Sequence, residues 1–85
     1  MELDCGIQRK RIVGWLRDEL ALSCEGQAWV FEADGKACHI TADELESRRL
    51  GTVNLDRTLV TIEGDEAAAE AFMRLFTLRF MSAGG

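Results

Sequence analysis

Residues 27–41 read QAWVFEADGKACHIT, two apolar-rich runs joined by Asp34-Gly35. An Asp-Gly pair between such runs favours a type I′ β-hairpin, because both residues of that turn need positive φ. The turn also determines the register, in which the cross-strand pairs are Ala33 with Lys36, Phe31 with Cys38, and Trp29 with Ile40. The sequence therefore predicts an antiparallel hairpin with one apolar face, opposite a mixed face that meets solvent or a partner.

Upstream of the hairpin, residues 4–22 show helical spacing. Asp4 is a possible N-cap, and the residues spaced along one side of the helix are Ile12, Val13, Leu16 and Leu20. This pattern predicts a long first helix. One alternative stays open at the very start, because residues 1–4 (MELD) could instead pair as an extra edge strand.

Downstream of the hairpin, residues 41–44 read TADE, which has the form of a capping box. It predicts a short helix from Ala42 to Leu50. Residues 58–62 (TLVTI) are rich in β-branched side chains and predict a third strand. Residues 52–55 (TVNL) form either a fourth, very short strand or a connector.

The last helix is predicted to begin after Asp65, an N-cap residue followed by the strong helix former EAAAEAF. The resulting order is α-β-β-α-β-α. It describes an α+β two-layer sandwich with a small, mainly antiparallel sheet of three or four strands, two long helices and one short helix. With residues 1–4 as a strand, the order becomes β-α-β-β-α-β-α, a ferredoxin-like variant. We expect a single domain at residues 1–82 and a frayed tail at residues 83–85.

The charge of the chain is negative, with 15 acidic and 10 basic residues and a net charge of −5. Phosphate binding needs clustered Lys and Arg, so this balance argues against nucleic acid as the main partner. The chain opens with the acidic MELDCG and contains no apolar run long enough to span a membrane. We therefore expect a cytoplasmic protein that does not bind membranes.

The side chains that carry chemistry are few. The three cysteines, Cys5, Cys24 and Cys38, lack CxxC spacing and are expected to be reduced and structural. Cys38 and His39 are adjacent, but neighbouring residues of a strand point to opposite faces, so they cannot readily share an ion or form a dyad. The sequence therefore assigns no catalytic residue, no metal site and no cofactor.

Arg9, Lys10 and Arg11 form the only basic run. Cations near the start of a helix oppose its dipole, so an anion contact is a hypothesis for these residues. No aromatic side chain lies within the run to stack on a base. We interpret it mainly as a solvated helix face.

The chain ends in Gly84-Gly85, which resembles the C-terminus of ubiquitin-like sulfur carriers, where the last glycine is activated as an acyl group. Those carriers begin with a β-hairpin and end in a strand. The order expected here begins and ends with a helix. The expected order of elements therefore differs from that of these carriers, and the chain is not assigned to them.

The last helix has an unusually wide apolar surface. On a helical wheel, Glu66, Glu70, Arg74 and Thr77 form one narrow polar stripe. The remaining arc covers roughly 240°, whereas a helix lying on a core needs about 100°. The sheet and the first helix cover part of it, and a partner is expected to bury the rest. The predicted interface residues are Phe72, Met73, Phe76, Phe80 and Met81.

The sequence thus predicts a small non-enzymatic protein that associates with itself, as a homodimer, or with another protein. Two alternatives remain at this point. One is a module that binds a small ligand or nucleic acid through the basic run. The other is a small enzyme or redox protein that depends on Cys38 or His39.

Overall fold

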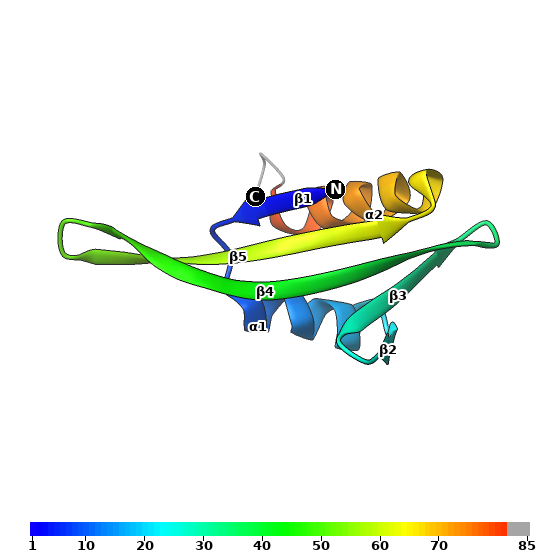
Figure 1. Cartoon of the computed structure of the whole chain (residues 1–85), viewed down its shortest axis with the longest axis horizontal. Coiled ribbons are helices and arrows are strands. Elements are labelled where there is room, and N and C mark those ends of the chain that lie inside the picture. Colours follow the sequence, from blue (N-terminus) through cyan, green and yellow to red (C-terminus); the bar gives the residue numbers. More distant parts are fainter. Residues whose placement is uncertain (82–85) are drawn as a thin grey trace.

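The chain folds into a five-stranded antiparallel sheet with its helices on one face (Figure 1). The computed structural model describes residues 1–81. The elements, in order, are β1 (Glu2–Cys5), α1 (Arg9–Gly14), a π-helical continuation η1 (Trp15–Glu19), β2 (Ser23–Glu25), β3 (Ala28–Ala33), β4 (Lys36–Leu50), β5 (Val53–Gly64) and α2 (Glu66–Phe80).

The strands lie in the order β1-β5-β4-β3-β2, and every neighbouring pair is antiparallel. The β3–β4 hairpin has the predicted register, including Phe31 opposite Cys38 and Trp29 opposite Ile40. Asp34 and Gly35 have φ values of 53° and 75°, as a type I′ turn requires. The prediction made from the Asp-Gly turn is therefore confirmed.

The predicted order α-β-β-α-β-α, with three or four strands, is wrong. The main error is the expected short helix at Ala42–Leu50, which is the second half of the 15-residue strand β4. A helix of nine residues is marginal by itself, whereas this segment pairs with β5 and buries Ala42 beside Val60. The ferredoxin-like variant fails for the same reason, because its second helix is this segment.

The start of the chain also differs from the main prediction. Residues Glu2–Cys5 form the edge strand β1, paired with β5, which is the alternative left open for MELD. Asp4 therefore lies in a strand and does not cap a helix. The first helix begins only at Arg9, because strand pairing holds Glu2–Cys5 and residues 6–8 connect that strand to the helix. Its apolar side is as predicted, with Ile12 and Leu16 fully buried.

Helix α2 begins as the sequence predicts. The Ala68 N–H donates to the Asp65 carboxylate at 3.0 Å, which is the expected N-cap. Its inner side and that of α1 pack on the same sheet face, because their buried residues and those of β4 and β5 form one core. The core consists of Cys5, Ile12, Trp15, Leu16, Cys38, Ile40, Ala42, Val60, Ile62, Ala68, Ala69, Phe72 and Phe76. The tail predicted at residues 83–85 lies outside the described residues.

Candidate functional site

The aromatic residues of α2 surround Trp15 of η1. The Trp15 ring centroid lies 5.7 Å from that of Phe72, 6.0 Å from Phe76 and 5.3 Å from Phe80. Phe72 and Phe76 are fully buried, so these two predicted interface residues belong to the core of the chain itself. Phe80 is half-buried against Trp15. Its ring also contacts the guanidinium of Arg79, 5.0 Å from the ring centroid.

The outer side of α2 remains apolar where it passes the start of the chain. A shallow groove of about 550 Å³, here called the α2 groove, is lined by Met1, Glu70, Met73, Arg74, Thr77 and Leu78. Met73 is half-buried, whereas Leu78 is 69% exposed. Met81, also predicted at the interface, lies just beyond the helix and is 50% exposed. The accessible apolar surface of α2 is therefore made by its Leu and Met side chains and not by its buried phenylalanines.

Met1 is a lining residue that sequence reasoning missed. Its backbone pairs with that of Ile62: the terminal ammonium donates to the Ile62 carbonyl at 2.9 Å, and the Ile62 N–H donates to the Met1 carbonyl at 2.8 Å. This pairing places Met1 beside α2. No local signal in the sequence could have indicated this position, because it depends on contact between residues 61 positions apart.

A second exposed apolar surface lies on the long β4–β5 hairpin. Residues 46–56, here called the arm, continue both strands away from the body of the protein to the turn at Gly51-Thr52 (Figure 1, left). The exposed fractions are 59% for Leu50, 55% for Val53 and 41% for Leu55. Leu50 and Val53 are cross-strand partners and so lie on one side of the arm. Sequence reasoning missed this surface because it assigned the segment to a helix.

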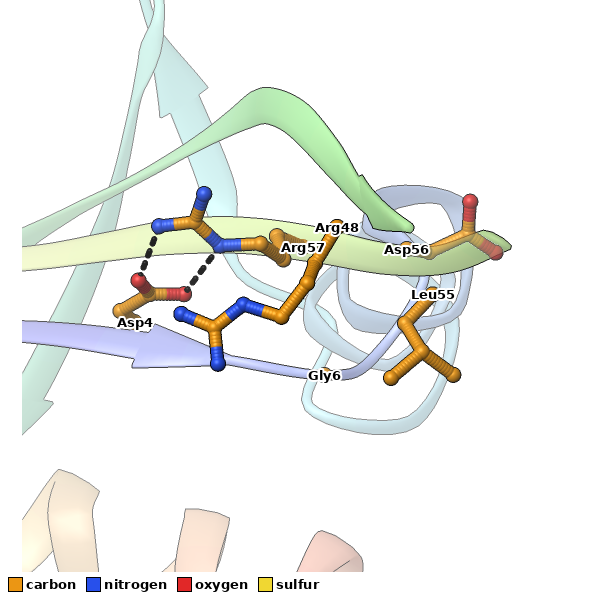
Figure 2. A pocket seen from close by; sticks show the side chains of 6 residues that line it. All are labelled: Asp4, Gly6, Arg48, Leu55, Asp56 and Arg57. Atoms are coloured by element: carbon orange, nitrogen blue, oxygen red, sulfur yellow. Dashed lines mark hydrogen bonds and ion pairs between the residues drawn. The ribbon is translucent and has the colours of Figure 1, made fainter. Parts of the chain in front are cut away.

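Charged residues gather where the arm leaves the body. A pocket of about 290 Å³ is lined by Asp4, Gly6, Arg48, Leu55, Asp56 and Arg57 (Figure 2). The Arg57 guanidinium donates to both carboxylate oxygens of Asp4, and Arg48 lies beside the same carboxylate. These contacts lower the pKa of Asp4, mainly through the Arg57 hydrogen bonds, and raise the pKa of Arg57. A β-bulge between Leu45 and Arg48 breaks the strand register at this point.

The basic run of α1 does not form one site. Arg9 donates through Nε to the Ala42 carbonyl at 2.6 Å, which joins α1 to β4. The Arg11 guanidinium lies 5.7 Å from the centroid of the Phe80 ring. Lys10 is exposed. The three side chains thus have different surroundings, and two of them contribute to packing within the chain.

The cysteine and histidine side chains are likewise separate. Cys5 and Cys38 are buried, and burial raises the pKa of both thiols. Cys24 is exposed. His39 lies on the opposite face of the sheet from Cys38, with its Nε2 3.8 Å from a carboxylate oxygen of Glu25. Within residues 1–81 there is no group of three or more His, Cys, Asp or Glu side chains that could hold a metal ion.

The comparisons with known proteins identify the family. The family described as archaeal MoaD-like protein matches residues 3–85, almost the whole chain. The chain belongs to this archaeal MoaD-like family. A search of curated proteins and of solved structures found no match. None of the helices in the described residues is long and apolar enough to cross a membrane.

The fold of this MoaD-like chain differs from the arrangement of ubiquitin-like carriers. MoaD-like proteins are associated with the β-grasp fold. Here the first strand is followed by a helix, β1 pairs antiparallel with β5, and the last described element is helix α2. The family is thus established by sequence, and the last element of the described residues is a helix and not a strand.

Proposed function

We propose that this MoaD-like protein acts by protein–protein association and not by catalysis with its own side chains, and that it forms a homodimer through the α2 groove. The observation that carries the proposal is the apolar lining of that groove, in particular the exposed Leu78 and Met1 beside the half-buried Met73. Contiguous exposed apolar side chains mark interaction surfaces, and Met is enriched in interface centres. The raised pKa of the Cys5 and Cys38 thiols supports a non-catalytic role, because a thiolate is the reactive form.

The charges at the groove favour a second copy as the partner. Glu70 and Arg74 are four residues apart on the exposed side of α2. When two α2 helices pack antiparallel about a twofold axis, Glu70 of one copy can face Arg74 of the other, and the reverse pair forms by symmetry. A symmetric contact would thus pair both charges while burying the apolar side chains between them.

The groove alone makes a weak dimer. Met1, Met73 and Leu78 contribute six side chains from two copies, each worth about 1.5 kcal/mol on burial because they are already partly covered. Their sum is about 9 kcal/mol. Association costs about 4–15 kcal/mol in lost motional freedom, so at most about 5 kcal/mol remains, which corresponds to a dissociation constant of about 0.2 mM at best.

The test is the oligomeric state on dilution, measured by sedimentation velocity. Leu78→Asp is expected to give a monomer with unchanged circular dichroism, because residue 78 is exposed within the chain. Leu75→Asp is the matched control, since residue 75 is an exposed leucine of α2 that does not line the groove. A wild-type chain that stays monomeric at high concentration would contradict the proposal.

Sulfur carriage is a second candidate function, favoured by the family and by Gly84-Gly85. The family match extends to residue 85, and a MoaD-like family suggests a sulfur carrier. In such a role the terminal carboxylate would be activated and converted to a thiocarboxylate. Intact-mass measurement of the chain purified from its own cells tests this directly, because one oxygen of Gly85 would be replaced by sulfur. Gly85→Ala is the control expected to abolish that mass change.

A further inference from the structure

We infer that the sheet face opposite the helices binds another protein, whose surface is basic around an apolar centre. This face, taken without the arm, is here called the open face. Both helices pack on the other face, because their buried residues share one core with β4 and β5. The strand residues that point to the open face are all half-buried or exposed. The proposed α2 dimer leaves this face accessible, since α2 lies on the other side of the sheet.

The alternation of side chains along the strands identifies the centre of the open face. Ile40 and Ile62 are cross-strand partners buried in the core. The next pair along, Thr41 and Thr61, therefore points to the open face. The centre consists of half-buried side chains without charge: Val30, Thr41, Leu59 and Thr61. An uncharged centre of this kind is typical of protein interfaces.

Carboxylates surround this centre. Five exposed acidic residues lie on the open face beside the mutually paired Asp4 and Arg57: Glu2, Glu25, Glu32, Asp43 and Glu63. Together they carry the same charge, −5, as the whole chain. Within residues 1–81 only Glu25 among them has an ion-pair partner, His39 at 3.8 Å. Like charges close together on a sheet lower its stability, so the fold by itself does not account for them.

These charges determine the kind of partner. Nucleic acid, an anionic membrane surface and the open face of a second copy are all negative, and the carboxylates would repel each of them. Lys and Arg side chains of a partner would complement the carboxylates, and apolar side chains between them would cover Leu59 and Val30. The open face is therefore matched by a basic protein surface.

A synthetic amphipathic helical peptide, with leucines on one side and lysines on the other, is the probe that tests the inference. Added to the ¹⁵N-labelled protein, it should shift the amide resonances of Thr41, Leu59 and Thr61. Shifts centred on α2 or on the arm instead would overturn the inference, as would the absence of shifts at the highest soluble peptide concentration. Complete displacement of the peptide by spermidine would also overturn it, because a cation without an apolar surface would then suffice.

Paired charge variants show whether the position of the carboxylates matters. The double variant Asp43→Asn/Glu63→Gln removes two charges from the open face and should raise the dissociation constant of the peptide about five- to tenfold, measured by calorimetry. Glu44→Gln/Glu66→Gln is the matched control with the same net charge. Glu44 pairs with the buried Thr58 and so lies on the helical face, and Glu66 lies on α2. Equal affinities of the two double variants would overturn the inference.

A variant of the centre tests the apolar part of the contact. Leu59→Thr keeps a β-branched residue in the strand and removes apolar surface, so peptide binding should weaken while circular dichroism stays unchanged. An unchanged dissociation constant would mean that the centre takes no part, and the inference would fail. Leu78→Asp separates the inference from the proposed function, because it should abolish the α2 dimer and leave peptide binding unaltered. Loss of peptide binding in Leu78→Asp would place the contact at α2 and overturn the inference.

Discussion

The inner and outer halves of the β4–β5 hairpin have the same secondary structure but different surroundings. In the inner half, Ile40 and Ile62 are cross-strand partners with at most 2% exposure, covered by both helices. In the outer half, Leu50 and Val53 are also cross-strand partners, and both are more than half exposed. Pairing between strands therefore holds the arm together, while tertiary packing holds only the inner half.

This difference divides one element by its role in folding. Side chains of the inner half stabilise the monomer, whereas apolar side chains of the arm cover no core. Exposed apolar residues on a projecting hairpin carry a risk of aggregation.

The largest effect on stability is expected at Ile40 in the core, and it is compared with the effect at Leu50 in the arm. Ile40→Ala should lower the free energy of unfolding by about 2–5 kcal/mol, because it leaves a cavity in the core. Leu50→Ala should change it by about 0.5 kcal/mol or less. Urea unfolding followed by tryptophan fluorescence, at a concentration where the chain is monomeric, measures both values. An equal loss for the two variants would show that the arm is packed in the monomer.

Two glycines allow the same comparison of the packed part of the hairpin with the arm, now for the backbone. Gly64, at the end of β5, has φ +128°, and a Cβ there would lie 2.8 Å from the Ala37 carbonyl oxygen. Gly51, in the turn of the arm, has φ +63°, and a Cβ there meets no atom of the described residues within 4 Å.

Gly64→Ala should therefore cost about 3 kcal/mol, from backbone strain and steric overlap together. Gly51→Ala should cost about 1 kcal/mol from strain alone. Thermal unfolding of the two variants compares the costs. A loss for Gly51→Ala as large as that for Gly64→Ala would mean that the turn is packed against other residues.

The smallest effect on stability is expected where the inner half of the β4–β5 hairpin meets the arm. At this boundary Asp4 pairs with Arg57. The pKa of Asp4 is lowered from 3.8, so the ion pair contributes stability above about pH 4 that is lost as the pH falls through the lowered folded-state value. Asp4→Asn should therefore lose less stability than the wild type as the pH is lowered below about 4. Glu2→Gln on the same strand is the control, and identical acid profiles for wild type and Asp4→Asn would contradict the prediction.

The candidate site could be predicted only in part from the sequence. The helical wheel of α2 predicted a helix with more apolar surface than one neighbour could cover. It could not tell which part was covered, because that depends on Trp15, more than fifty residues away in the chain. Phe72 and Phe76 therefore became core residues, while Met73 and Leu78 remained accessible.

Local chemistry by itself determined the features that need only neighbouring residues. Asp34-Gly35 fixed the β3–β4 turn and its register, and Asp65 fixed the start of α2, because a turn or a cap is satisfied within a few residues. Only the tertiary structure decided the segment at residues 42–50. Its capping box favoured a helix locally, but pairing with β5 and burial of Ala42 supplied more hydrogen bonds and apolar contact than an isolated short helix could.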